Sequence, residues 1–237
     1  LPTLVARIGM LVVDEAHCIS DWGHDFRPDY RRLRELIAQM PPGVPVLATT
    51  ATANIRVVAD VAEQLGAEVA EAVAPDTDAA SGASPAGETA GSVLTLRGPL
   101  ARTSLRLGVL SLPDAPSRLA WLIANLGALP GSGIIYTLTV AAADDTARLL
   151  RSRGYEVRAY TGQTDTDERE ESEVLLKDNQ VKALVATSAL GMGFDATLGF
   201  VVNMGAPQSP VAYYQQVGRA GRGTDEATVV LLPALED

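Results

Sequence analysis

Two adjacent carboxylates, Asp14 and Glu15, directly follow the apolar run at residues 8–13. The run predicts a buried strand, and the end of a strand in an open α/β sheet is where groups that act on a bound nucleotide are placed. Phosphoryl transfer to water needs a Mg²⁺ ion on the phosphates and a group that deprotonates the attacking water. Asp14 could hold the ion and Glu15 could address the water. An acidic pair at this position also suits a solvated turn or a helix cap.

The loop after this pair has side chains that suit contact with nucleic acid. Among polar residues it carries Trp22, His24, Phe26 and Arg27. A glycine and a proline within the loop disfavour helix and strand. Rings and a guanidinium in such a loop could stack on bases and touch phosphates, although the aromatic residues could also be ordinary core residues. His17 precedes the loop and could relay the state of the phosphate to it, or it could be a buried histidine with satisfied hydrogen bonds.

Small hydroxyl residues follow the next apolar run, at 44–48. Thr50 and Thr52 could hydrogen-bond a carboxylate and transmit its state. Because serine and threonine are also preferred at helix N-caps, the same residues could simply start the helix expected at 54–65.

Two further strings lie in the second half of the chain. Residues 186–195, which include Thr187, Gly193 and Asp195, contain glycines that allow close approach of the backbone to a phosphate. Asp195 could accept a hydrogen bond from a ribose hydroxyl or an arginine, while the Gly-x-Gly alone also suits a turn. Arg219 and Arg222 share a helical face and could reach a γ-phosphate as arginine fingers. They could equally be favourable charges at a helix C-terminus that a glycine ends.

Strand-like and helix-like segments alternate along the chain, which predicts an α/β fold with parallel sheets and right-handed crossovers. The expected strands are 8–13, 44–48, 132–136, 156–160, 181–186, 200–202 and 228–232, and the expected helices are 30–39, 54–65, 115–126, 140–153, 167–177 and 210–217. A Gly-Pro pair marks a boundary, so a first lobe is expected over 1–97, a linker over 98–102 and a second lobe over 103–237. The first lobe has too few strands for a whole α/β domain, which predicts a missing front end.

Charge and composition narrow the class of protein. The net charge of −10 argues against a broadly basic nucleic-acid binder. Residues 66–92 hold five carboxylates and no basic residue, which predicts a disordered or loosely ordered insert and leaves the remainder closer to neutral. One cysteine and two histidines exclude a disulfide framework and a cysteine-rich zinc module. No apolar run approaches the ~18 residues of a membrane span. The single cysteine fits a reducing, cytoplasmic setting, and the excess of arginine over lysine suggests a bacterial source.

Together these strings resemble the motifs of superfamily 2 helicases. The resemblance covers motif II at 14–17, motif III at 50–52, motif IV at 133–136, motif V at 186–195 and motif VI at 215–222. The aromatic loop at 18–28 resembles one that is peculiar to the RecQ family, and it is the specific part of the match. The order and spacing fit along nearly the whole chain.

The resemblance implies two RecA-like lobes with ATP in the cleft between them. It implies an ATP-dependent DNA helicase that moves 3′ to 5′ on single-stranded DNA and unwinds partly duplex DNA in repair or recombination. The catalytic residues would be Glu15 as base and Arg219 and Arg222 as sensors of the γ-phosphate, with Arg222 preferred as the finger. Asp14 would bind Mg²⁺, and ATP would be bound by Asp14, Gly193, Asp195 and Gln215. Coupling to DNA would fall to His17, Trp22, His24, Phe26, Arg27, Thr50, Thr52 and Thr187.

The sequence departs from the family in several places. It has no Gly-x-x-x-x-Gly-Lys-Ser/Thr string, which in this family would precede Leu1, so residues 1–237 alone are expected to show little or no ATPase activity. The family's zinc-binding part is also absent, and no zinc site is expected. Thr137-Leu138 stand where Cys-Asn usually follows the tyrosine of motif IV, which favours a RecQ-like bacterial branch. The rival readings are an RNA-directed superfamily 2 helicase and a non-catalytic nucleic-acid-binding remnant, and protein partners are unknown.

Overall fold

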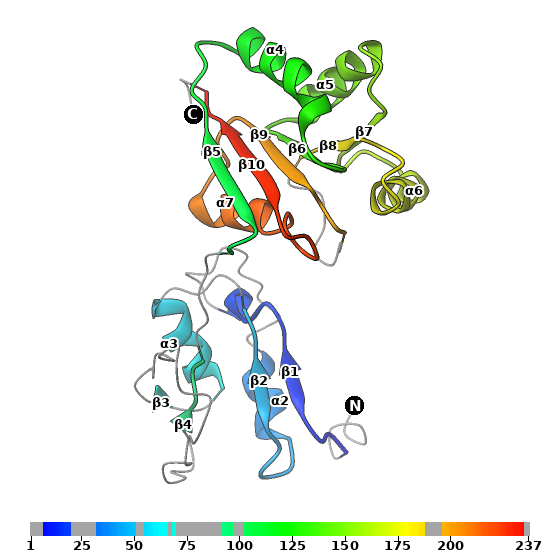
Figure 1. Cartoon of the computed structure of the whole chain (residues 1–237). Helices are drawn as coiled ribbons and strands as arrows, with labels where there is room; N and C mark the ends of the chain where they lie inside the picture. The colour runs from blue at the N-terminus through cyan, green and yellow to red at the C-terminus, as the bar shows by residue number, and fades with distance from the viewer. Residues whose placement is uncertain are drawn as a thin grey trace. The chain divides into compact units, whose positions relative to one another are not determined.

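A computed structural model of the chain forms two compact units, residues 1–100 and 101–237, each with its own sheets and core (Figure 1). The structure describes residues 7–19, 32–50, 55–65, 68–69, 92–96, 102–187 and 196–234. Every strand pairing within these ranges is parallel. This confirms the α/β fold class with parallel sheets that the alternating sequence pattern predicts.

The second unit is built on a six-stranded sheet. In chain order its strands are β5 (Leu105–Val109), β6 (Gly133–Thr137), β7 (Val157–Tyr160), β8 (Ala183–Ala186), β9 (Phe200–Met204) and β10 (Ala227–Leu232). Across the sheet they run β5-β10-β9-β6-β8-β7. The inner strands β6 and β8 are buried along their whole length. Burial on both faces explains why their sequences are apolar runs and not alternating patterns.

In the described part of this unit, four α-helices connect the strands. They are α4 (Ala115–Asn125), which runs into the 3₁₀ turn η3 (Leu126–Ala128), α5 (Val140–Ser152), α6 (Thr166–Lys177) and α7 (Pro210–Val217). Three of them begin at a capping side chain that accepts a backbone N–H of the first turn: Asp114 from Ser117, Thr139 from Ala142 and Ser209 from Ala212. Such caps satisfy donors that have no partner within the helix, so the helix starts can be read from the sequence.

The helices cover the two faces of the sheet and form one core on each. Leu122 of α4 and Leu150 of α5 pack with Ile135 of β6 on one face. On the other face, Leu176 of α6 and Val217 of α7 pack in the cluster that holds Ile134 and Tyr136 of β6. Successive side chains of a strand point to opposite faces, so β6 contributes to both cores.

The first unit is smaller in its described part. It contains β1 (Leu11–Val13), the 3₁₀ turn η1 (Ala16–Ile19), α2 (Leu33–Ala38), β2 (Val46–Ala48), α3 (Ile55–Gln64), β3 (Glu68–Val69) and β4 (Ser92–Val93). Strands β1 and β2 pair with each other, as do β3 and β4. Val13, Ala16, Val57 and Val61 form the buried cluster that joins β1 and η1 to α3.

Three strands, β3, β4 and β5, were not predicted from the sequence. Arg106 and Gly108 interrupt the apolar run of β5, and this strand lies at the edge of its sheet, where burial on both faces is not required. The strands β3 and β4 fall at the two ends of the acidic segment 66–92, and their pairing was not expected there. Residues 70–91, for which disorder was predicted, lie outside the described ranges. No helix within the described residues is long and apolar enough to cross a membrane.

Gly133 of β6 offers a test of the packing between β6 and β9. A Cβ atom at this position would lie 2.3 Å from the backbone oxygen of Phe200 and 2.6 Å from its ring. Because the obstacle includes backbone, we expect Gly133→Ala to destabilise the second unit by about 1–3 kcal/mol, the usual cost of overpacking. Urea unfolding followed by circular dichroism measures the change.

Gly108 of β5 is the matched control. A Cβ atom there would meet only the backbone oxygen of Val229, at 3.8 Å, which is ordinary contact. Gly108→Ala should be neutral or slightly stabilising, because alanine lowers the entropy of the unfolded chain. Equal effects of the two substitutions would contradict the close approach of β9 to Gly133.

Candidate functional site

The parallel register of β1 and β2 brings the acidic pair beside the threonines that follow β2. Val13 pairs with Ala48, and the ladder continues past the strands, since the N–H of Thr49 donates to the carbonyl of Val13 over 2.9 Å and the N–H of Ala16 donates to the carbonyl of Thr49 over 2.9 Å. The carboxyl ends of parallel strands meet at one edge of a sheet. Two segments that are distant in the sequence therefore share one edge.

Asp14 is held by two hydrogen bonds. Thr49 Oγ1 donates to its Oδ1 over 2.7 Å, and the backbone N–H of Glu15 donates to the same oxygen over 2.9 Å. These two bonds, that of the Thr49 hydroxyl first, lower the pKa of Asp14 below its ordinary value of 3.8. Asp14 is exposed, so this edge presents an oriented, ionised carboxylate to solvent.

Glu15 turns away from Asp14 and contacts a buried histidine. Its φ angle is 49°, in the left-handed region that non-glycine residues seldom adopt. Its Oε2 lies 3.1 Å from Nδ1 of His17, and the same Nδ1 lies 3.1 Å from Oγ1 of Thr50. His17 is fully buried while the Glu15 side chain is one-third exposed. A polar chain thus runs from a carboxylate that water can reach, by way of one nitrogen of the buried ring, Nδ1, to the threonine after β2.

Arg219 and Arg222 follow the end of α7 and differ in exposure. Arg219 is half-buried, and burial raises the pKa of Tyr136 on β6 to about 12 although the positive charge of Arg219 acts in the opposite direction. Arg222 is exposed, and its Nε donates to the carbonyl of Gly218 over 3.2 Å. The two arginines therefore have different environments, although their spacing would put them on one face of a helix.

The loop that carries Arg222 is fixed at several points. The carbonyl of Gly218 also accepts from Arg102 over 2.9 Å, and Ser104 Oγ donates to the carbonyl of Gly221 over 3.2 Å. Gly221 has a φ of +72°, and a Cβ atom there would lie 2.7 Å from Ser104 Oγ. Only glycine combines this backbone conformation with so close an approach.

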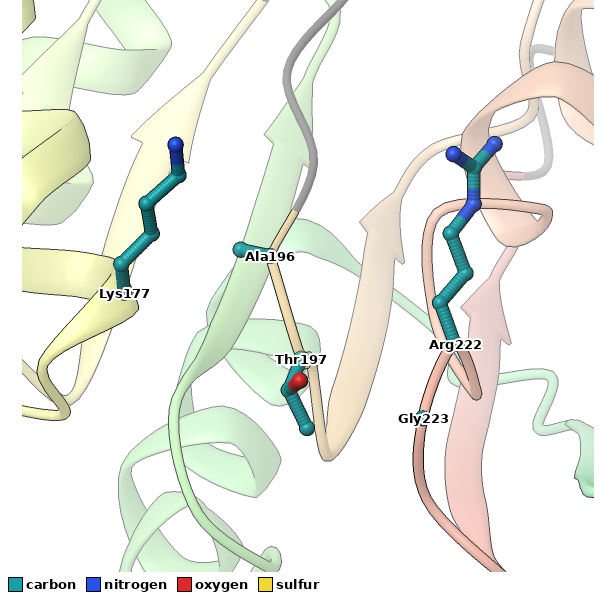
Figure 2. A pocket seen from close by; sticks show the side chains of 5 residues that line it. All are labelled: Lys177, Ala196, Thr197, Arg222 and Gly223. Atoms are coloured by element: carbon teal, nitrogen blue, oxygen red, sulfur yellow. The ribbon is translucent and has the colours of Figure 1, made fainter.

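Arg222 lines a cavity of about 290 Å³ in the second unit. Figure 2 shows Lys177, at the end of α6, and Arg222 on either side of the segment Ala196–Thr197, with Gly223 next to Arg222. Two cationic side chains, one hydroxyl and backbone suit an anionic group such as a phosphate. Lys177 was not a predicted site residue, because a lysine at the end of an exposed helix carries no signal in the sequence.

The structure places only part of the predicted site. Gln215 is half-buried on α7, and Thr187 lies just after β8. The predicted residues outside the described ranges are Trp22, His24, Phe26, Arg27, Thr52, Gly193 and Asp195. Thr49 was missed, since which threonine meets Asp14 depends on the strand register.

The donor set at β1 fits Mg²⁺. No cluster of three or more histidine, cysteine or acidic side chains suited to a metal occurs in the described part of the chain. Mg²⁺ is usually held by one or two carboxylates together with waters and the phosphates of the nucleotide. Asp14 supplies one ionised oxygen ligand of this kind, oriented by Thr49.

The chain matches two protein families. Residues 2–61 match the DEAD/DEAH box helicase family, and residues 117–224 match the helicase conserved C-terminal domain. The first match contains Asp14 and Glu15, and the second contains Arg219 and Arg222.

Curated relatives are DNA helicases by name. The ATP-dependent DNA helicase RecQ of Pasteurella multocida is 31% identical over 95% of this chain and 32% of its own length. The RecQ-like DNA helicase BLM of Xenopus laevis is 33% identical over 99% of this chain and 15% of its own length. The ATP-dependent DNA helicase Q5 of Rattus norvegicus is 34% identical over 94% of this chain and 22% of its own length. The chain thus spans about a third or less of these relatives.

Solved structures support the fold. Dbp5 from S. cerevisiae bound to Gle1 and IP6 has a TM-score of 0.70 at 18% identity, over 98% of this chain and 54% of that one. The Mycobacterium smegmatis helicase Lhr bound to ssDNA and AMP-PNP has a TM-score of 0.67 at 20% identity, over 98% of this chain and 29% of that one. Both units therefore share the α/β fold of these solved helicases. With the two family matches, the chain carries segments of the DEAD/DEAH box helicase family and of the helicase conserved C-terminal domain, and it is similar to RecQ helicases along nearly its whole length.

Proposed function

We propose that this chain is part of the motor core of an ATP-dependent DNA helicase. The protein would couple hydrolysis of Mg·ATP to 3′ to 5′ movement on single-stranded DNA and to unwinding of duplex ahead, in DNA repair or recombination. The relatives' names support the ATP-dependent reaction and the DNA substrate. The direction of movement and the pathway rest on the family resemblance alone.

The observation that carries the proposal is the polar chain at the end of β1 and β2. Asp14 is oriented by Thr49, and Glu15 is joined through His17 to Thr50. In a nucleotide hydrolase, the first carboxylate binds the metal of the Mg·ATP substrate and the second takes the proton of the attacking water. Because Glu15 is linked to Thr50 through His17, loss of the bound phosphate beside Glu15 would be transmitted to the residues that follow β2.

Asp14, Glu15 and Arg222 each have a distinct role in this proposal. Asp14 offers an ionised oxygen to the metal of Mg·ATP, and Glu15, partly exposed, is open to the attacking water. Arg222 offers an exposed guanidinium to phosphate oxygens, where an arginine stabilises the charge that develops in the transition state. Gly193 and Asp195 would contact the nucleotide, and the aromatic loop with Trp22 and Phe26 would contact DNA.

A comparison of nucleic acids tests the substrate. We expect single-stranded DNA to raise the rate of ATP hydrolysis by the full-length protein by about tenfold or more, and single-stranded RNA of the same sequence to raise it much less. Steady-state phosphate release measures both. Greater stimulation by RNA would favour an RNA-directed helicase, and no hydrolysis with either would favour a non-catalytic nucleic-acid-binding protein.

Glu15→Gln tests the base. The amide cannot accept the proton of the attacking water, so kcat should fall by about 10² to 10⁴, the usual contribution of general base catalysis. Binding of ATP, followed with a fluorescent nucleotide, should remain within a few-fold of wild type.

Glu63→Gln is the control for this change. Glu63 is an exposed carboxylate on α3 of the same unit, so its loss alters the charge equally without touching the site. A kcat for Glu15→Gln close to that of Glu63→Gln would remove Glu15 from the role of base.

Thr49→Val tests the orientation of Asp14. The ordinary pKa of Asp14, 3.8, lies far below neutral, so the carboxylate stays ionised at pH 7 in this variant and only its orientation is lost. The Mg²⁺ concentration for half-maximal ATP hydrolysis should therefore rise by about tenfold, as expected for loss of a group that orients a metal ligand.

A carboxyl titration by NMR gives a second readout. The pKa of Asp14 should rise toward 3.8 in Thr49→Val, because the largest cause of its lowering is removed. The lowered pKa adds stability that is present above pH 3.8 and is lost as the pH falls through the pKa of the folded state. Thr49→Ser keeps the hydroxyl and should retain both wild-type values, and a shift in the serine variant equal to that in valine would count against the hydrogen bond.

A further inference from the structure

The chain enters the second unit alongside the loop that carries Arg222. We call residues 102–104, which directly precede β5, the entry segment. Leu105 of β5 pairs with Ala227, the first residue of β10 (Figure 1), and the N–H of Ala227 donates to the carbonyl of Ser104 over 2.7 Å. Because this pairing continues into the entry segment, the segment lies beside the end of the loop that leads from α7 into β10.

Two arginines from distant parts of the sequence share one acceptor in this loop. Nη1 of Arg102, in the entry segment, donates to the carbonyl of Gly218 over 2.9 Å. Nε of Arg222 donates to the same carbonyl over 3.2 Å. A backbone carbonyl has two lone pairs and can accept both bonds. Gly218 is the C-cap of α7, where carbonyls have no partner within the helix and positive charge is favourable.

The shared acceptor belongs to a glycine, whose backbone is the least restricted of any residue. The N–H of Gly218 is held within α7, since it donates to the carbonyl of Tyr214 over 2.9 Å. Its carbonyl lies beyond the last turn of the helix, so its direction depends on what it meets outside the helix. A hydrogen bond from a charged donor is of the stronger kind. The bond from Arg102 therefore holds this carbonyl where Nε of Arg222 can reach it.

The position of this carbonyl affects the guanidinium of Arg222 directly. The guanidinium is planar, and its donors lie in a fixed fork. The bond from Nε to Gly218 thus sets the plane of the group and the direction of its two Nη atoms, which are the atoms that meet phosphate oxygens in pairs. Arg222 lines the cavity described above (Figure 2). Its orientation on Gly218 therefore decides how it faces an anion there.

A capping role alone would need only a positive charge near the last carbonyl of α7. The bond from Arg102 is exposed, and exposed polar contacts add little to stability. The shared carbonyl gives this bond a further consequence, because the second donor is the arginine at the cavity. Loss of the bond should therefore affect the reaction more than the stability of the unit.

We propose that Arg102 is a positioning residue for ATP hydrolysis, which holds the carbonyl of Gly218 and thereby orients Arg222 toward the phosphate. This inference rests on the proposed function, because it assigns a role in that reaction. It connects the residue with which the chain enters the second unit to the residue that meets the phosphate.

Arg102→Met in the full-length protein tests the inference, because methionine keeps an unbranched side chain and removes every N–H donor. A small displacement of a group that acts on the transition state can lower kcat by about tenfold to a hundredfold. We expect DNA-stimulated kcat to fall by about tenfold, and KM for ATP to change by less than about twofold, since the lost orientation matters in the transition state. The Tm should stay close to that of the wild type.

Arg148→Met is the matched control. Arg148 is an exposed arginine on α5 of the same unit, and its Nη1 donates to Oδ1 of Asp145 over 2.9 Å. The control therefore removes the same charge and a bond of the same length at a distance from the loop. Its kcat should equal that of the wild type, and equal kcat values for Arg148→Met and Arg102→Met would overturn the positioning role.

A double-mutant cycle with Arg222→Ala tests whether Arg102 acts through Arg222. If it does, adding Arg102→Met to Arg222→Ala should cause no further loss in the rate of hydrolysis, measured in single turnovers. Losses that multiply in the double variant would overturn the proposal.

An NMR measurement reports the orientation without any activity. The signal of the Arg222 Nε–H, assigned by its absence in Arg222→Ala, should have a lower order parameter in Arg102→Met than in the wild type and in Arg148→Met. An unchanged order parameter would overturn the positioning role. Absence of DNA-stimulated hydrolysis by the wild type would instead overturn the proposed function, and with it the role in turnover, so the two failures are distinguishable.

Discussion

The parallel pairing of β1 with β2 is the constraint on which the candidate site depends. It places Val13 opposite Ala48, so that Asp14 and Thr49 are the next residues on each strand and can share a hydrogen bond. A shift of register by one residue would send every side chain of the strand to the other face, and Thr49 would no longer reach Asp14. The buried cluster of Val13 and Ala16 with α3 fixes this register, because the apolar side chains of β1 pack only when they face that helix.

In the second unit, the constraint is to hold the exposed guanidinium of Arg222 in place on a loop. An exposed arginine alone is mobile, because its side chain carries about 2 kcal/mol of rotamer entropy. Here the backbone of the loop is fixed by Arg102 and Ser104, and Gly221 allows the chain to approach Ser104 closely. Fixing the backbone leaves only the side chain of Arg222 to be ordered when an anion binds, which lowers the entropic cost of the contact.

Much of this arrangement could be predicted from the sequence, and the exceptions share a cause. The helices α4, α5 and α7 start where a capping Asp, Thr or Ser precedes the apolar pattern, since capping is a local interaction. The strand β1 was predicted from residue 8 but begins at Leu11. Leu11 is the residue whose N–H makes the first hydrogen bond to the neighbouring segment, at the carbonyl of Pro45. The role of Thr49 was not predicted, because it depends on a partner that only the strand register brings near. Local signals are visible in one sequence, whereas contacts between distant segments are not.

The left-handed backbone at Glu15 explains how two adjacent carboxylates can do different work. In a continuing strand, neighbouring side chains point to opposite faces of the sheet, which would separate Asp14 and Glu15 from a shared substrate. A φ of 49° at Glu15 turns the chain out of the strand and into η1, at a cost of about 1–3 kcal/mol for a non-glycine residue. Backbone bonds from Ala16 to Thr49 and from Cys18 to Glu15 offset part of that cost. After this turn, Asp14 accepts the hydrogen bond of Thr49, while the carboxylate of Glu15 contacts His17. The strain is therefore located at the residue whose side chain must leave the sheet, and a glycine there would relieve the backbone but remove the carboxylate.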